Sequence, residues 1–211
     1  MRVLSKYVDL VNASMKKEHA RFTPAAFTNF VRKIINDPGV KFKTKRSPAA
    51  ELNTILVSGL YDPEEDQENF PSIEITLHFN PAQPAVKLIE LNYTKAFLEI
   101  CEIIRHEVCH QAQYRSRKWR VPVPFNSSHE DPDIRDEQEY LGTADEIEAY
   151  SISIASEILI KNQFVVPKAV IKEINTTSMF KLYEEAFGKK HQIVAQVKEC
   201  TLRYLRHFKG T

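Results

Sequence analysis

The stretch Arg105–His110 reads R-H-E-V-C-H and contains the motif H-E-x-x-H. From Thr94 onward apolar residues recur at helical spacing, which predicts that His106 and His110 lie on one long helix. Four residues make a little more than one turn, so the two imidazoles share a face, about 6 Å apart along the axis. Two imidazole nitrogens placed in this way can bind one zinc ion at about 2.0–2.1 Å each.

Glu107 lies between the two histidines and is placed to take a proton from a water molecule at such a metal. The alternative is an amphipathic helix whose histidines are ordinary residues of its polar face. The helical setting and a downstream carboxylate favour the metal site. We therefore expect His106 and His110 to bind Zn²⁺ and Glu107 to be the catalytic residue.

The bulk properties are those of an ordinary globular protein. The chain has 211 residues, 43% of them hydrophobic and 27% charged, with a formal net charge of +1. This balance does not favour nucleic acid or an anionic membrane as a partner. The N-terminus lacks the apolar run of a signal peptide, and no stretch approaches about 18 consecutive apolar residues. We expect a cytoplasmic protein, with association with a virion left open.

The three cysteines agree with a reducing compartment. They are an odd number, with no C-x-x-C pair among them. Cys101 and Cys109 are eight residues apart on the same expected helix, where they cannot form a disulfide without breaking it. Free thiols are therefore the expected state.

Before the H-E-x-x-H helix, the hydrophobic patterns predict two helices and a small antiparallel sheet. Thr23, followed by proline, is typical of an N-cap. The stretch 40–46 alternates apolar and basic residues, which indicates an edge strand protected by lysines. The stretch 73–79 alternates cleanly between apolar and polar residues. The expected helices are 3–17 and 24–36, and the expected strands are 40–46, 54–60 (buried), 73–79 and 86–91.

After that helix comes a basic run, Arg115–Arg120, which includes Trp119. Such a run could bind nucleic acid, but cations also stabilise the C-terminus of a helix, and we favour the second interpretation. Residues 121–141 show no periodicity and predict a long loop that restricts access to the site. The remaining segments predict helices at 143–161, from Pro167, at 178–187 and at 192–208.

A catalytic zinc ion usually has three protein ligands. The candidates for the third are His129, Glu146 and Glu148. Glu148 is two residues after Glu146, about 200° around the helix, so only one of the two glutamates can face the metal. Thr143 and Glu146 also fit the spacing of a capping box, in which the glutamate needs no metal.

Residues 146–150 read E-I-E-A-Y, and with the upstream H-E-x-x-H they resemble the gluzincin metallopeptidases. These include the thermolysin-like enzymes and the small ImmA/IrrE-type peptidases of bacteria and phages. The resemblance implies that Glu146 is the third metal ligand and that Ala149 lets the two helices approach closely. The larger enzymes often have an acidic residue where this chain has Tyr150, so the partner that orients a ligating histidine must come from elsewhere.

The resemblance also implies a fold and a function. We expect a single zincin-like α+β domain, with residues 1–117 forming the sheet and the active-site helix, 118–142 a loop, and 143–211 a helical lobe. The function implied is hydrolysis of peptide bonds in a protein or peptide substrate by a metal-activated water, with Glu107 as the general base. The substrate would add a strand along the edge formed by 73–79. Tyr140, Tyr150 and His191 are the candidate donors to the oxyanion.

Two other functions fit parts of the pattern. One is a non-catalytic zincin-fold protein with a structural or assembly role, for example in a phage. Glu107 argues against it, because a purely structural site needs no general base and is normally closed by four ligands. The other is a DNA-associated SprT-like protease that uses Arg115–Arg120, and a histidine third ligand such as His129 would favour it.

Overall fold

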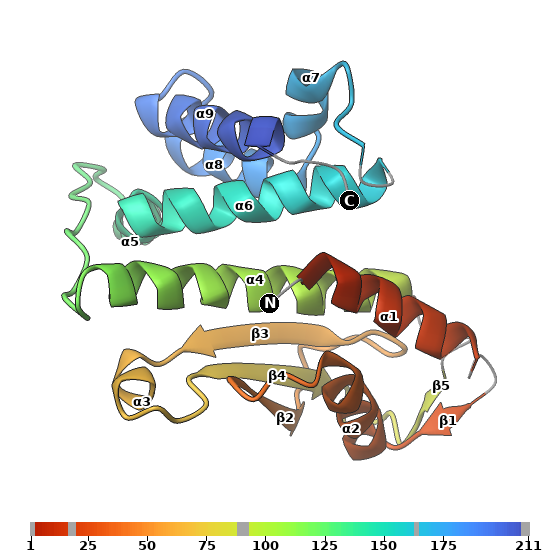
Figure 1. Ribbon diagram of the computed structural model, residues 1–211. Helices are drawn as coiled ribbons and strands as arrows, with labels where there is room; N and C mark the ends of the chain where they lie inside the picture. The colour runs from red at the N-terminus through yellow and green to blue at the C-terminus, as the bar shows by residue number, and fades with distance from the viewer. Residues whose placement is uncertain (1–2, 17–19, 88–92, 163–164, 208–211) are drawn as a thin grey trace. The chain divides into compact units, whose positions relative to one another are not determined.

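The computed structural model describes residues 3–16, 20–87, 93–162 and 165–207, and its class is α+β (Figure 1). The chain divides into two compact units, residues 1–111 and 112–211, which are described one at a time. Helix α4, Tyr93–Ser116, belongs to both, since its last residues from Ala112 onward lie in the second unit. No helix in the described ranges has the length and apolar character needed to cross a membrane.

The first unit contains a three-stranded mixed sheet in the order β2-β4-β3. The central strand β4, Ile73–Phe79, pairs in parallel with β2, Val40–Arg46, and antiparallel with β3, Leu56–Tyr61. The prediction of an antiparallel sheet is therefore wrong for one of the two pairings. Alternation of apolar residues shows which face of a strand is buried, but it does not show the direction of the neighbouring strand.

The strand positions correct two further predictions. Strand β4 is the centre of the sheet and not its edge, so a substrate strand cannot pair with 73–79 as expected. Strand β3 is half-buried rather than buried: Val57 and Tyr61 face the core, whereas Leu56 and Leu60 are 46% and 61% exposed. The edges of the sheet are β3 and the lysine-bearing β2, and the second of these confirms the predicted edge strand.

The core of the first unit joins the sheet to helices on its faces. The apolar residues of β4 are all buried, as their alternation predicts. Phe27 of α2, Pro24–Ile35, packs edge-on against Phe79 of β4 at 6.2 Å between ring centroids and stacks on Phe97 of α4 at 6.1 Å. Helix α2 begins where predicted, because the Thr23 side chain accepts a hydrogen bond from the Ala26 amide at 3.2 Å.

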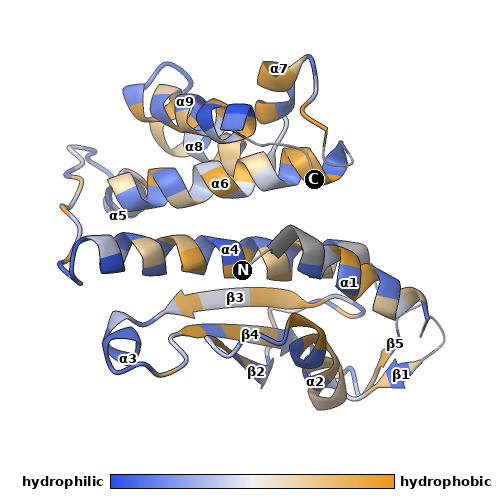
Figure 2. Cartoon of the chain, viewed as in Figure 1, coloured by the Kyte–Doolittle hydropathy of each residue, from blue (hydrophilic) through white to orange (hydrophobic). Residues whose placement is uncertain are grey.

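Smaller elements complete this unit. Helix α1 spans Val3–Met15, and β1, Arg21–Phe22, pairs with β5, Val86–Lys87. Strand β5 therefore pairs with a strand that the sequence analysis did not predict, and not with the three-stranded sheet. The rest of the predicted strand 86–91 lies outside the described residues. The short helix α3, Pro63–Gln67, is hydrophilic (Figure 2), yet its Asp66 is buried and accepts a hydrogen bond from Gln111 of α4 at 2.8 Å.

The second unit is helical, and most of its helices are where the sequence predicts them. Helices α6, α8 and α9 agree with the predicted segments 143–161, 178–187 and 192–208, apart from Phe208, which lies outside the described residues. Helix α7 begins at Val170 and not at Pro167. The bounds are α5 Pro132–Leu141, α6 Ala144–Lys161, α7 Val170–Ile174, α8 Ser178–Phe187 and α9 Gln192–His207.

The predicted loop 121–141 is wrong over its second half, which forms α5. The Asp131 side chain caps this helix by accepting a hydrogen bond from the Asp133 amide at 3.0 Å, and Pro132 occupies its first turn. This is the same cap-and-proline signal that Thr23 and Pro24 give. Lack of apolar periodicity concealed a helix whose start is encoded locally.

The core of the second unit gathers around α6 and α9. Ser151 of α6 donates a hydrogen bond to the carbonyl of Val197 of α9 at 3.2 Å, and this close approach is allowed by small side chains on α6. The buried apolar side chains include Ile154, Ile158, Phe180, Tyr183, Ile193 and Val197. Helix α6 is thus fixed along its length by its own unit.

Candidate metal centre

Helix α4 places His106 and His110 side by side, as the spacing predicts. Their Nε2 atoms are 3.0 Å apart, and the two half-buried rings are nearly perpendicular, at 84°. Two nitrogens that bind one zinc ion tetrahedrally at about 2.05 Å are about 3.3 Å apart. The pair is therefore close to the geometry that a shared metal ion requires.

Glu107 lies against strand β3 at a glycine. It is only 8% exposed. A Cβ atom added at Gly59 would be 2.9 Å from Oε1 of Glu107 and 2.3 Å from Cγ2 of Ile103. Gly59 therefore allows α4 and its carboxylate to approach the strand. Sequence reasoning missed this residue, although an isolated glycine inside a strand pattern indicates a close backbone approach.

Helix α6 presents Glu146 in its first turn. The side chain of Thr143 caps the helix by accepting a hydrogen bond from the Glu146 amide at 3.3 Å, which is the backbone half of the predicted capping box. The Glu146 side chain is 8% exposed. Capping by Thr143 uses only the backbone of Glu146, so it does not compete with a role for the carboxylate.

Glu148 has other partners in the helical unit. One carboxylate oxygen accepts a hydrogen bond from the Tyr204 hydroxyl at 2.5 Å, and the other accepts one from the Gln113 amide at 3.1 Å. Burial by itself would raise the pKa of Glu148, but these hydrogen bonds outweigh it and lower the pKa. One oxygen of Glu148 thus joins α6 to α9, and the other joins α6 to the last turns of α4.

His106 and His110 belong to the first unit, whereas Glu146 and the other two candidates for the third ligand belong to the second. Of these candidates, His129 is exposed, and its Nδ1 accepts a hydrogen bond from the Asp131 amide at 3.1 Å in the turn before α5.

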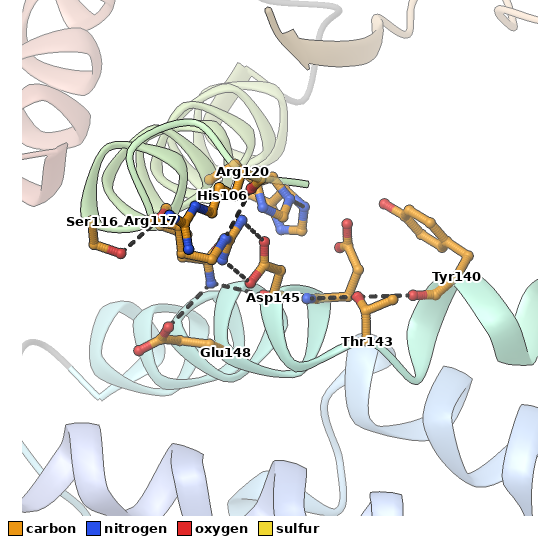
Figure 3. A network of polar contacts seen from close by, with 11 residues as sticks. His106, Ser116, Arg117, Arg120, Tyr140, Thr143, Asp145 and Glu148 are labelled. Carbon is orange, nitrogen blue, oxygen red and sulfur yellow. Dashed lines mark hydrogen bonds and ion pairs between the residues drawn. The ribbon is translucent and has the colours of Figure 1, made fainter. Parts of the chain in front are cut away.

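The basic run Arg115–Arg120 ends α4. Lys118 and Trp119 have left-handed backbones, with φ of 54° and 59°, which stop the helix. Arg117 binds Asp145 of α6 through two hydrogen bonds of 2.6 Å each (Figure 3). Arg117, one of the four cations of the run, therefore has a partner within the helical unit.

Of the three candidate oxyanion donors, Tyr140 lies next to Glu146. Burial, and then the negative charge of Glu146, raise the pKa of Tyr140. The ring of Tyr150 packs edge-on against Tyr183 at 5.7 Å. His191 accepts a hydrogen bond from the Ile193 amide at 3.2 Å and packs on Phe187, so it serves the start of α9.

Comparisons with protein-family models, with curated proteins and with solved structures find no match for this chain. Any function assigned to it must therefore be argued from its own residues and their geometry.

Proposed function

We propose that this chain is a zinc-dependent metallopeptidase of zincin-like fold, in which His106, His110 and Glu146 hold Zn²⁺ and Glu107 is the general base. The observation that carries the proposal lies within the first unit: the Nε2 atoms of His106 and His110 are 3.0 Å apart on α4, and the same helix carries the buried carboxylate of Glu107. Glu146 is proposed as the third ligand from the resemblance to the gluzincin pattern.

The donor set fits a catalytic zinc ion. Two imidazoles and one carboxylate are among the ligand sets of catalytic sites, which keep a fourth position open. Both oxygens of Glu148 are used in contacts within the helical unit, and Glu146 occupies the position that the resemblance assigns to the third ligand. Three ligands and an adjacent buried carboxylate fit a catalytic site better than a structural one, which four ligands would close.

The roles of the side chains follow from their positions. When bound, Zn²⁺ would polarise the substrate carbonyl and increase the acidity of a water molecule. Glu107 takes the proton of the attacking water and passes it to the leaving amine. The hydroxyl of Tyr140, next to Glu146, is the candidate donor to the negative oxygen that develops on the substrate.

The substrate class that fits is an extended peptide. Strand β3 is an edge of the sheet, and its Gly59 lies against Glu107. The backbone groups of an edge strand that point away from the sheet can pair with an added strand. We therefore assign to β3 the substrate-binding edge that the sequence placed at 73–79.

The test is hydrolysis of a peptide library by the full-length protein loaded with zinc. We expect cleavage that disappears when a chelator removes the metal and returns when zinc is added back, because the ligands and the base remain in place. Mass spectrometry of the products identifies the cleaved bonds. Absence of cleavage across the library, or cleavage that resists the chelator, would contradict the proposal.

Gly59→Ala should reduce kcat without removing zinc. The new methyl group would overlap Ile103 and touch the carboxylate of Glu107, so the base must move. A displacement of about 1 Å at a reacting group can reduce the rate by about 100-fold. The measurement is kcat together with zinc content.

The matched control is Gly39→Ala, in the turn just before β2. Its added methyl group would meet only Asp37, at 3.3 Å. We expect nearly unchanged kcat for this variant. A Gly59→Ala protein with the kcat of the wild type would refute the role of Gly59.

A further inference from the structure

We propose that Arg117 and Asp145 form a clamp that positions Glu146 for the metal, a role that rests on the proposed function. The clamp is a pair of parallel hydrogen bonds of 2.6 Å, from the two terminal nitrogens of Arg117 to the two carboxylate oxygens of Asp145 (Figure 3). Asp145 immediately precedes Glu146 on α6. Whatever fixes the backbone of Asp145 therefore fixes that of the ligand.

The contacts of Gln113 strengthen the clamp from the same side. Its amide donates to the backbone carbonyl of Asp145 and to the carboxylate of Glu148, both at 3.1 Å. Residues on each side of Glu146 are thus held from the end of α4. The contacts of Arg117 and Gln113 with α6 all lie within the helical unit, residues 112–211.

Helical spacing connects this clamp to the two histidines. His106, His110, Gln113 and Arg117 are separated by four, three and four residues, which places them along one face of a helix. The two histidines form the first part of that face, and the residues that hold Asp145 form the last. The residues that hold Asp145 therefore continue the helix face on which the two histidines lie.

The chemistry of the pair suits a positioning role. The side chains of Arg117 and Asp145 are 28% and 10% exposed. Two parallel hydrogen bonds between a guanidinium and a carboxylate restrain direction as well as distance, which a lysine cannot do. Arg117 is further restrained because its Nε donates to the carbonyl of Arg120 at 3.2 Å.

The clamp differs from the histidine partner that position 150 lacks. The larger gluzincin-like enzymes often carry an acidic residue there, and this chain has Tyr150. In this chain the acidic residue directly before the ligand is held by Arg117 instead. The clamp acts on the glutamate ligand through the backbone, and it does not act on a histidine.

The experiment measures zinc affinity by competition with a chromophoric chelator, for the full-length wild type and for Asp145→Asn and Arg117→Lys. Asp145→Asn keeps the size of the side chain but removes its negative charge. Arg117→Lys keeps the positive charge but removes the two parallel nitrogen donors. Loss of an outer partner of a ligand typically weakens metal binding by about 10–100-fold, and we expect a loss in that range. The visible absorption spectrum of the Co²⁺ form should change as well, because the ligand geometry changes.

The matched control is Glu157→Gln, which breaks the ion pair between Glu157 and Lys161 on the same helix, away from its first turn. It should leave zinc affinity and the Co²⁺ spectrum unchanged. Thermal unfolding of each apo protein shows whether a variant is folded. The double variant should bind zinc no more weakly than the weaker single variant, because the two residues act as one unit.

The outcomes separate this role from the proposed function. If the wild type binds zinc and the two clamp variants bind it equally well, the clamp has no positioning role, and the peptidase proposal remains. If the variants lose only thermal stability, the pair is merely structural and the inference is overturned. If the wild type binds no zinc, the proposed function itself fails and the role of the clamp fails with it.

Discussion

Replacing Glu107 by glutamine should reduce kcat for peptide hydrolysis by about 10²–10⁴-fold, which is the usual contribution of a general base. Glutamine has nearly the same size as glutamate and can remain in the buried position against Gly59, but it cannot accept the proton. Because Glu107 is not among the proposed ligands, zinc should stay bound. The measurement is kcat with the peptide cleaved by the wild type, beside zinc content.

The control for this variant is Glu99→Gln. Glu99 lies on the same helix, two turns earlier, and forms an ion pair with Lys95 at 3.7 Å. Removing its charge should leave kcat within about twofold of the wild type, because an ion pair with an exposed lysine contributes little. Glu107→Gln with full activity would show that another residue is the base, or that the activity comes from elsewhere.

Glu146→Ala should weaken zinc binding by more than the roughly 10–100-fold that loss of an outer partner costs, since it removes a ligand itself. Two imidazoles would remain, and catalytic zinc ions usually need three protein ligands. The dissociation constant for zinc, measured by competition with a chelator, is the quantity to compare. Activity should fall with it at limiting zinc.

Glu148→Gln is the matched comparison for Glu146→Ala. Glu148 is two residues away on α6, and its oxygens accept hydrogen bonds from Tyr204 and Gln113. We expect this variant to lose thermal stability but to bind zinc within a few-fold of the wild type. Tight zinc binding by Glu146→Ala together with weak binding by Glu148→Gln would reverse the assignment of the third ligand.

The parts of the fold that the sequence predicts are those with local causes. The H-E-x-x-H helix, the start of α2 at Thr23 and the start of α6 at Thr143 depend on spacing and caps within a few residues. The direction and order of the strands depend on pairing between distant segments, and the prediction fails there. Helix α5 was missed for another reason: its cap is local, but its apolar pattern is weak.

The candidate site, like the fold, has parts that the sequence predicts and parts that it does not. His106, Glu107 and His110 lie within five residues on one helix, so the motif alone predicts that the two histidines lie side by side. The glycine that admits the carboxylate of Glu107 and the pairing of Arg117 with Asp145 join residues that are 48 and 28 positions apart. No spacing rule reports such contacts, and they become visible only once the elements are packed.

The most direct test of the central claim is the zinc content of the protein purified without a metal-affinity tag, beside that of His106→Ala. The proposed site predicts about one zinc ion per wild-type chain and almost none in the variant, because one of three ligands is lost. Both proteins should show the same circular dichroism, since His106 is a half-buried residue of a long helix. A wild type that contains no zinc, and takes up none when zinc is added, would contradict the assignment of a metallopeptidase.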